Sequence, residues 1–319
     1  MLFSKFKYFD RFILQKIHQK NLDPFQHEAV WKLKQQGQVV FENYLNDSAL
    51  IFFKENIQQR LERHDYEMPC LSHEKINDLN PTHQEHIKKY LSLSADELLK
   101  LGISFTKEDV MKKTLESVLK TYKPSTLKLL LSEKYLEKYL NVWLDPYILD
   151  IIESYLGMRP YLTEAYVRRN YPAKYSVMNH QWHRDKNNSL YLLKMFIFFN
   201  DCDEWNGPHE YVESSHCDSS LNRKQYYSNE EVYEYAKKTG RRISVSKVKA
   251  GTIILEDTRG LHHARIPERG YRDLGFAVFT PLTLMTRGRV CEYSIPKNFL
   301  RQLSGRQKSY LLKSCISKS

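Results

Sequence analysis

The hydrophobic pattern of the chain changes near Gly157, and this change constrains the fold more than any other feature. After this residue, short runs rich in β-branched and aromatic side chains alternate with turn residues, which is typical of antiparallel strands. The runs cover residues 161–167, 175–183, 191–199, 252–255 and 274–280. One helix is expected between them, beginning at a capping box of Ser228 and Glu231 and ending at Gly240. The pattern predicts an antiparallel β-sandwich or barrel.

The first half of the chain has a helical pattern instead. A short strand is expected over residues 38–45, followed by a helix that Asn46 or Asp47 caps. Apolar and basic residues alternate over residues 1–21, which favours an amphipathic helix packed on the main domain, with a membrane-surface anchor as the alternative. The predicted fold class is therefore mainly β with a helical buttress.

We find no internal repeat or low-complexity linker, so a single domain over residues 1–319 is expected. Its parts would be an N-terminal helical extension, a mostly helical part, a β core and a basic C-terminal tail. These parts are predicted at residues 1–32, 33–158, 159–285 and 286–319.

Composition limits the class of protein. The net charge of +11 favours an anionic partner only weakly, and the oligomeric state is left open. No apolar run approaches the roughly 18 residues of a membrane span, and no secretory signal is recognisable. The five cysteines are odd in number and lack CxxC spacing, which predicts reduced thiols and a cytoplasmic location.

A possible metal site begins at the end of the run over residues 175–183. Side chains alternate along a strand, so His183 and Asp185 project to the same side. The best third ligand is His262, 79 residues further on, after the expected strand over residues 252–255. Two imidazoles and one carboxylate are the ligand set of non-haem iron(II) oxygenases, and they leave metal positions open. Ten residues after His262, Arg272 could grip a carboxylate through two parallel hydrogen bonds.

Several stretches together resemble the phytanoyl-CoA dioxygenase-like family of iron(II)- and 2-oxoglutarate-dependent oxygenases. The two main ones are Gln181-Trp-His-Arg-Asp185 and Asp257-Thr-Arg-Gly-Leu-His262, which are similar to the two metal motifs of that family. Further similarities lie at residues 33–45, 154–160, 193–199 and 207–216. The resemblance runs from about residue 33 to 285 and is least at residues 65–130.

This resemblance implies a double-stranded β-helix in which His183, Asp185 and His262 bind iron(II) and Arg272 anchors 2-oxoglutarate. It also implies that oxygen is activated, giving succinate, carbon dioxide and a hydroxylated product. Lys194 is a second candidate for the cosubstrate carboxylate. The family often has a hydroxyl two residues after the second histidine, where this chain has Ala264, so Arg272 and Lys194 would carry more of that task.

Neighbouring polar residues have alternative interpretations. His263 would be the ligand if the register slipped by one residue, although only one of the two adjacent histidines can face inward. His180 is interpreted as structural and Trp182 as part of the core. Asn179 and Gln181 share the strand face of His183, so they either line the pocket or make buried hydrogen bonds.

The predicted function is hydroxylation of a C–H bond in an unidentified small-molecule, lipid-like or glycan substrate. One alternative is a binding or scaffold protein that keeps the fold without turnover. Another is a nucleic-acid-binding or nucleic-acid-modifying protein, which the net charge suggests but no recognition motif supports. A zinc hydrolase would need helical ligand spacing and a general-base glutamate, and neither is found.

Overall fold

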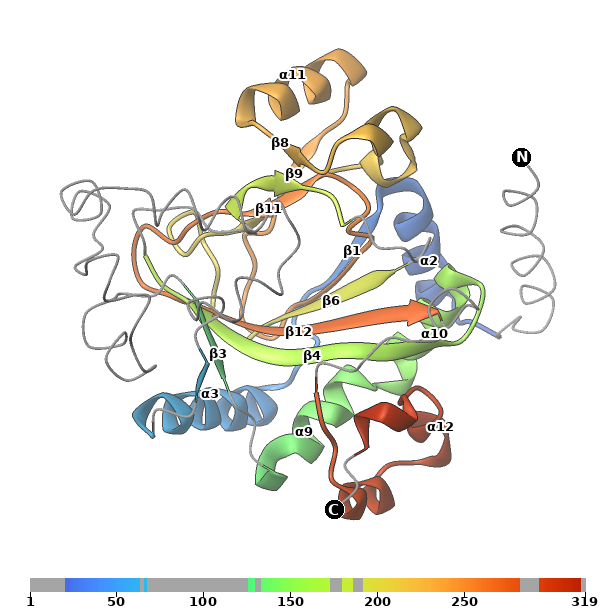
Figure 1. Ribbon diagram of the computed structural model, residues 1–319, viewed down its shortest axis with the longest axis vertical. Coiled ribbons are helices and arrows are strands. Elements are labelled where there is room, and N and C mark those ends of the chain that lie inside the picture. The colour runs from blue at the N-terminus through green and yellow to red at the C-terminus, as the bar shows by residue number, and fades with distance from the viewer. Residues whose placement is uncertain are drawn as a thin grey trace.

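The computed structural model describes residues 21–63, 66–67, 126–129, 133–172, 180–185, 192–281 and 293–316. Among these residues, seven strands form a larger antiparallel sheet in the order β1-β10-β6-β12-β4-β3-β2. Five more form a smaller sheet in the order β8-β5-β11-β7-β9. The two sheets face each other, and helices cover the far side of the larger sheet (Figure 1). Two facing antiparallel sheets are the arrangement expected from the sequence.

The larger sheet is built from strands of the whole chain. Its strands are β1 (Gln38–Phe41), β2 (Tyr66–Glu67), β3 (Thr126–Leu129), β4 (Pro160–Asn170), β6 (Leu193–Phe198), β10 (Ile253–Glu256) and β12 (Arg272–Pro281). Strand β12 is buried along its whole length and pairs with β4 and β6. The expected strands at residues 161–167, 191–199, 252–255 and 274–280 are therefore confirmed, and each is displaced by only a few residues.

The smaller sheet consists of β5 (Trp182–His183), β7 (His209–Val212), β8 (Tyr226–Tyr227), β9 (Ile243–Val245) and β11 (His262–Ala264). These strands are only two to four residues long, and β7, β8, β9 and β11 were not expected from the sequence. Short strands in a loop-rich sheet carry too few alternating positions to be recognised by periodicity.

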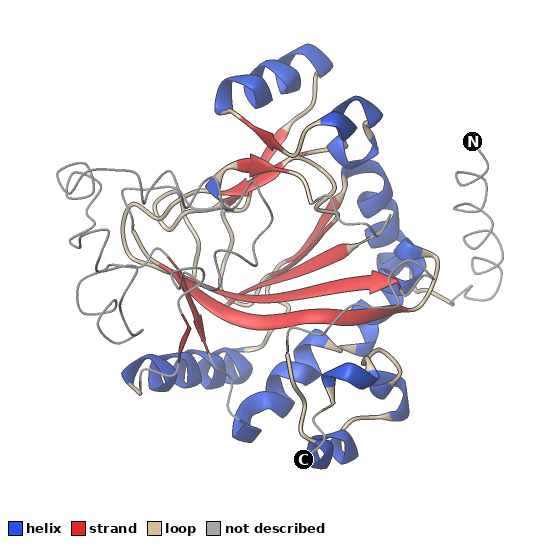
Figure 2. Cartoon of the chain, viewed as in Figure 1, coloured by secondary structure: helices blue, strands red, loops and turns tan. Residues whose placement is uncertain are grey.

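Helices flank both sheets (Figure 2). They are α2 (Pro24–Gln36), α3 (Asp47–Glu62), α9 (Glu133–Trp143), α10 (Pro146–Leu156), α11 (Asn229–Thr239) and α12 (Gly305–Lys308). Asn46 caps α3 as expected, and Ser228 with Glu231 forms the expected capping box of α11, which ends at Gly240. No helix in the described part of the chain is long and apolar enough to cross a membrane.

The two faces of the larger sheet bury different clusters. Its outer face packs against α2, α3, α9 and α10 through side chains such as Ile197, Leu255 and Phe279. Its inner face, toward the smaller sheet, carries Phe196 and Phe276 among other apolar side chains. Burial of this much apolar surface is the main stabilising contribution to the fold. The inner face is the one that meets the candidate site.

In the described residues of the first half, β1 lies within the strand expected over residues 38–45, whereas β2 and β3 were not expected and also join the larger sheet. The amphipathic segment over residues 1–21 lies almost entirely outside the described residues. Within the predicted basic tail, residues Lys297–Gln302 and Lys313–Cys315 form 3-10 helices. Cys202 and Cys217 are free thiols, whereas Cys315 is disulfide-bonded. The expectation of reduced cysteines is therefore wrong for Cys315, because the spacing of cysteines along a sequence does not reveal which of them meet in space.

Candidate metal centre

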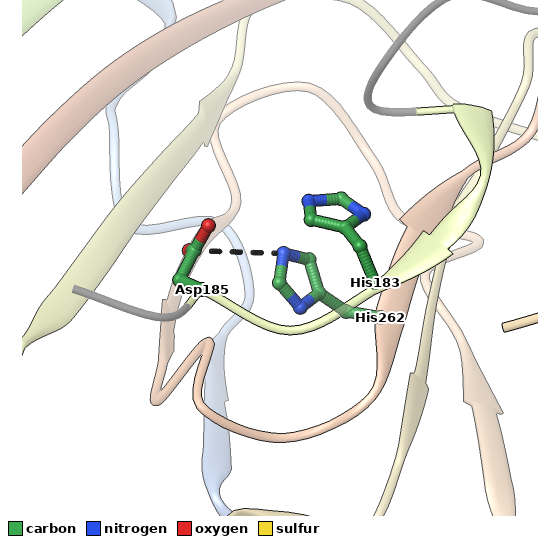
Figure 3. A group of neighbouring side chains, drawn as sticks. All are labelled: His183, Asp185 and His262. Atoms are coloured by element: carbon green, nitrogen blue, oxygen red, sulfur yellow. Dashed lines mark ion pairs between the residues drawn. The ribbon is translucent and has the colours of Figure 1, made fainter. Parts of the chain in front are cut away.

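Three of the predicted ligands meet between the two sheets. His183 ends β5 and His262 begins β11, and the two residues are direct partners in the antiparallel ladder. Their side chains therefore share one face of the smaller sheet, with ring centroids 4.2 Å apart. Asp185 follows β5, and one ligand atom from each residue lies within 4.8 Å of the others (Figure 3). This spacing suits three donors around one metal ion.

Backbone carbonyls orient both imidazoles. The Nδ1 atom of His183 lies 2.8 Å from the carbonyl oxygen of Gln181, and that of His262 lies 3.0 Å from the carbonyl oxygen of Gly260. In the tautomer that donates these bonds, the Nε2 atom carries the free lone pair. Hydrogen bonds of this kind fix the ring orientation of metal-binding histidines. The Nε2 atom of His262 accordingly lies 3.9 Å from Oδ2 of Asp185.

The protonation states also suit a metal ion. Burial lowers the pKa of His183, and burial together with the neighbouring His183 lowers that of His262 well below its usual range. Burial alone would raise the pKa of Asp185, but the Lys194 ammonium and the two imidazoles outweigh it and lower that pKa. At neutral pH the site therefore offers two neutral imidazoles and one carboxylate, which are the forms that bind metals.

The turn at residues 258–260 positions the triad through three successive carbonyl oxygens. The backbone N–H of Asp185 donates to the carbonyl oxygen of Thr258 at 2.9 Å, and the next carbonyl, that of Arg259, accepts from the Arg184 guanidinium. The third carbonyl in succession, that of Gly260, is the one that orients His262. Residues 258–260 thus fix both segments that carry metal ligands.

This turn is itself anchored by Asp257, whose side chain is fully buried. The phenol of Tyr155 donates to Oδ2 of Asp257 at 2.5 Å, and the Arg259 guanidinium pairs with the same carboxylate. The phenol of Tyr211 donates to the carbonyl oxygen of Asp257 at 3.1 Å. A Cβ atom added to Gly260 would lie 2.3 Å from that phenol oxygen, so only glycine fits there.

Arg272 begins β12 on the inner face of the larger sheet and is only 1% exposed. Its Nη2 atom donates to the side-chain oxygen of Asn170 at 3.2 Å. Its Nε and Nη1 atoms are buried without a hydrogen-bond acceptor among the described residues. Burial and the nearby Arg168 lower the pKa of Arg272 to about 10. Because unpaired buried cations are costly, this guanidinium is poised to bind an anion.

Lys194 lies on β6 and also faces inward. In the structure its ammonium forms an ion pair with Oδ2 of Asp185, a candidate metal ligand. It also lies 5.3 Å from the ring centroid of Phe276. The polar contact of Lys194 in the described structure is therefore with a candidate metal ligand, and its predicted contact with the cosubstrate carboxylate stays a prediction.

The remaining residues predicted near the site lie in different places. His263 faces the opposite side of the smaller sheet from His262, where it pairs with Glu210 and lies 4.1 Å from the Trp182 ring. The register alternative that made His263 a ligand therefore has no geometric support. Gln181 is half-buried, and its carbonyl oxygen orients His183. Asn179 lies outside the described residues.

The comparisons with known proteins found a likeness of fold but no likeness of sequence to a protein family or a curated protein. No family model and no curated protein sequence matches the chain. Among solved structures, the non-haem α-ketoglutarate-dependent epimerase SnoN from nogalamycin biosynthesis is similar at 12% identity, with 82% of this chain and 85% of that chain covered and a TM-score of 0.52. SnoN in complex with Fe3+, α-ketoglutarate and nogalamycin RO gives 11% identity, 81% and 85% coverage, and a TM-score of 0.50. At such low identity the likeness shows a shared fold.

The structure adds a buried pair that the sequence did not indicate. His209 on β7 lies with its Nε2 atom 2.9 Å and 3.0 Å from the two carboxyl oxygens of Glu256 on β10, so the pair joins the two sheets. Burial raises the pKa of Glu256 well above its usual range and lowers that of His209 well below it. The pair is therefore neutral and shares one proton. His209 also lies 5.6 Å from the His262 ring, at the edge of the site.

Tyr226 is a second residue that sequence analysis missed. It is the ladder partner of His183, and the two rings lie 6.2 Å apart. Burial, and secondly the charge of Asp185, raises the pKa of Tyr226 to about 12. Only the pairing of β5 with β8 brings this phenol to the site, and the two-residue β8 has no recognisable sequence signal.

Proposed function

We propose that the chain is an iron(II)- and 2-oxoglutarate-dependent oxygenase that hydroxylates a C–H bond of a small-molecule substrate. The observation that carries this proposal is the convergence of His183, Asp185 and His262 with their donor atoms within 4.8 Å of one another. Two imidazoles and one carboxylate from one side are the donor set of non-haem iron(II) oxygenases, and they leave positions for a cosubstrate and oxygen. A structural zinc site would instead need four protein ligands.

Arg272 supports 2-oxoglutarate as the cosubstrate. A guanidinium recognises a carboxylate through two parallel N–H···O bonds, and Arg272 has two buried N–H groups without acceptors among the described residues. It lies on the inner face of the larger sheet, and its charge acts on His209, whose ring centroid lies 5.6 Å from that of His262. A dicarboxylate could therefore reach Arg272 with one end and the metal with the other.

When bound, iron(II) with 2-oxoglutarate and oxygen would supply the oxidising chemistry and release succinate and carbon dioxide. The residues around the metal position would set the protonation and orientation of the ligands and exclude water. Lys194 keeps Asp185 ionised, and the two backbone carbonyls keep the imidazole Nε2 atoms directed toward the metal position. The aromatic rings of Phe196 and Phe276, 5.6 Å apart, provide an apolar wall that limits access of water.

We further propose that the chain belongs to the phytanoyl-CoA dioxygenase-like branch and folds as a single domain. The similarity of the two metal motifs supports the first point, and the fold shared with SnoN is consistent with it. The structure of SnoN with nogalamycin RO shows that this fold accommodates a small-molecule ligand. Lipid-like and glycan substrates remain within the proposal.

The test is an anaerobic titration of iron(II)-loaded protein with 2-oxoglutarate, followed by the visible metal-to-ligand charge-transfer band. We expect a band that requires both iron and 2-oxoglutarate. The variant Arg272→Met should weaken 2-oxoglutarate binding at least tenfold, in line with the loss of a charge-assisted bidentate contact. The exposed Arg301→Met is the matched control and should bind like the wild type.

Two results would contradict the proposal. If folded, iron-bound protein gives no band, the chain is a binding or scaffold protein that keeps the fold without turnover. If Asp185→Ala retains wild-type iron affinity, the assignment of the ligands is wrong. Circular dichroism of each variant separates these outcomes from loss of folding.

A further inference from the structure

The inner face of the larger sheet carries more positive charge than the cosubstrate needs. Arg168 on β4 is the ladder partner of Leu274 on β12 and of Lys128 on β3. Arg272 is opposite Asn170, two residues further along β4, so the two guanidiniums are diagonal neighbours on one face. We call Arg272, Arg168 and Lys128 the cation cluster.

Contacts with aromatic rings show that Arg168 and Lys128 face the interior between the sheets. The Arg168 guanidinium lies 5.8 Å from the ring centroid of Phe276, and the Lys128 ammonium lies 5.1 Å from that of Tyr166. These two rings are themselves 4.6 Å apart and belong to the inner-face cluster. The side chains therefore lie over an apolar floor.

Among the described residues, the cation cluster has no matching acid. In the described part of the chain, none of its three members forms an ion pair, and the Nε atom of Arg168 is buried without an acceptor, as are two nitrogen atoms of Arg272. Three acidic side chains of this region already have partners of their own. They are Asp273 with Arg169, Glu256 with His209, and Asp185 with Lys194.

The charge balance therefore calls for a second anion. The far carboxylate of 2-oxoglutarate carries one negative charge and matches Arg272, which leaves Arg168 and Lys128 without a counter-charge. Partly buried cations of this kind are stabilised strongly by an oxyanion that accepts their N–H bonds. Building on the function proposed above, we propose that Arg168 and Lys128 bind an oxyanion, a carboxylate or a phosphate, of the substrate. The substrate class is then an anionic small molecule.

The position of this subsite suits a substrate that reaches the metal. The ring centroid of His209 lies 5.0 Å from that of Phe196 and 5.6 Å from that of His262. Phe196, Phe276 and Tyr166 are ladder partners and form one row across the larger sheet. His262 therefore lies opposite this row. Arg168 is in the adjacent row, two residues along β4 from Tyr166, or about 7 Å. A substrate held at Arg168 thus needs to span only the aromatic floor and the separation of the two sheets, about 10 Å, to bring a C–H bond to the metal position.

The test uses protein loaded with Ni(II) and saturated with 2-oxoglutarate, so that the cosubstrate already occupies Arg272. Isothermal titration calorimetry then measures binding of inorganic phosphate and of benzoate, with benzamide as the neutral counterpart of benzoate. The variants are Arg168→Gln and Lys128→Gln, with Arg301→Gln as the exposed matched control. Affinity for 2-oxoglutarate is measured for each variant.

We expect the wild type to bind phosphate, benzoate or both with a Kd below about 10 mM, a weak but measurable affinity for such small probes. Both variants should weaken this binding at least tenfold while changing 2-oxoglutarate affinity less than about threefold. A preference for phosphate indicates a phosphorylated substrate, and a preference for benzoate over benzamide a carboxylic acid.

Three results would overturn the inference. They are no binding of either probe to the wild type, equal binding by wild type and variants, or a loss of 2-oxoglutarate affinity in Arg168→Gln as large as in Arg272→Met. The last result would assign Arg168 to the cosubstrate. If Arg168→Gln fails to fold, Lys128→Gln decides alone, because Lys128 lies on β3, next to the edge strand β2. If the wild type forms no complex with Ni(II) and 2-oxoglutarate, the proposed function fails, and the same titration of metal-free protein still tests the anion subsite.

Discussion

Replacing Arg272 by methionine should stabilise the metal-free protein while it removes cosubstrate binding. The ordinary pKa of an arginine is 12.5, and burial together with Arg168 lowers that of Arg272 to about 10. At 1.36 kcal/mol for each tenfold change in the equilibrium, the difference corresponds to about 3 kcal/mol. Because the pKa of this cation is lowered on folding, the cost is present at every pH below about 10, including neutral pH.

Methionine fills much of the same volume without a charge. It also loses the hydrogen bond to Asn170, which offsets about 1 kcal/mol of the gain. We therefore expect a net stabilisation of about 2 kcal/mol, or a rise in Tm of about 3 °C for a chain of 319 residues. Urea unfolding and calorimetry of metal-free wild type and Arg272→Met measure it, with Arg301→Met as a control that should stay within about 0.5 kcal/mol.

The opposite sign would refute the reasoning. If Arg272→Met is less stable than the wild type by more than about 1 kcal/mol, the guanidinium is a structural group whose partners stabilise the fold. Its two unpaired N–H groups would then say nothing about an anionic ligand. A variant that is more stable but still binds 2-oxoglutarate normally would show that the charge is unfavourable and yet serves another ligand.

Other predictions concern the triad and its support. Asp185→Ala should lower iron affinity by at least tenfold in a metal-binding titration and leave the far-UV circular dichroism unchanged, because the side chain is a proposed ligand and not part of the core. Because burial lowers the pKa of His183 and His262, the unfolded chain binds protons that the native site does not, so metal-free protein should lose stability in urea titrations as pH falls below about 6.5. Tyr155→Phe should reduce iron affinity roughly tenfold by loosening the 257–260 turn, and unchanged affinity would show that this turn does not position the ligands. Ser214, at φ 62°, adopts a left-handed conformation, but its hydroxyl also donates to the carbonyl oxygen of Gln35 at 2.6 Å, so the two effects of Ser214→Gly should offset each other and change the stability by less than about 1 kcal/mol in urea unfolding.

The candidate metal triad could be proposed from the sequence because its information is local. His183 and Asp185 are two residues apart at the end of one expected strand, and His262 follows a run that is recognisably a strand. Alternation then determines which side chains share a face, and the structure places these three together. The same rule separated His262 from its neighbour His263, which faces the other way.

The electrostatic partners could not be predicted, because they depend on register between distant strands. Glu256 lies opposite Lys194 only because β10 and β6 pair as they do, and a slip of β10 by one residue would turn Glu256 to the other face. His209 meets Glu256 across two sheets, which no periodicity in the sequence encodes. Arg168 was likewise unremarkable in the sequence, since its importance comes from the acidic partners that it lacks in the described structure.

The turn at residues 258–260 has a consequence for how the site is assembled during folding. It clasps the segment after β5 and the start of β11, two pieces of chain 79 residues apart in sequence. Closing such a long loop is slow compared with forming a helix, and neither piece can present its ligands correctly before the loop is closed. A folding intermediate that contains only the helices and the larger sheet would thus have no affinity for the metal ion. The appearance of metal affinity during refolding should coincide with closure of the smaller sheet. Adding the ion at different times after refolding begins would therefore measure when this sheet closes.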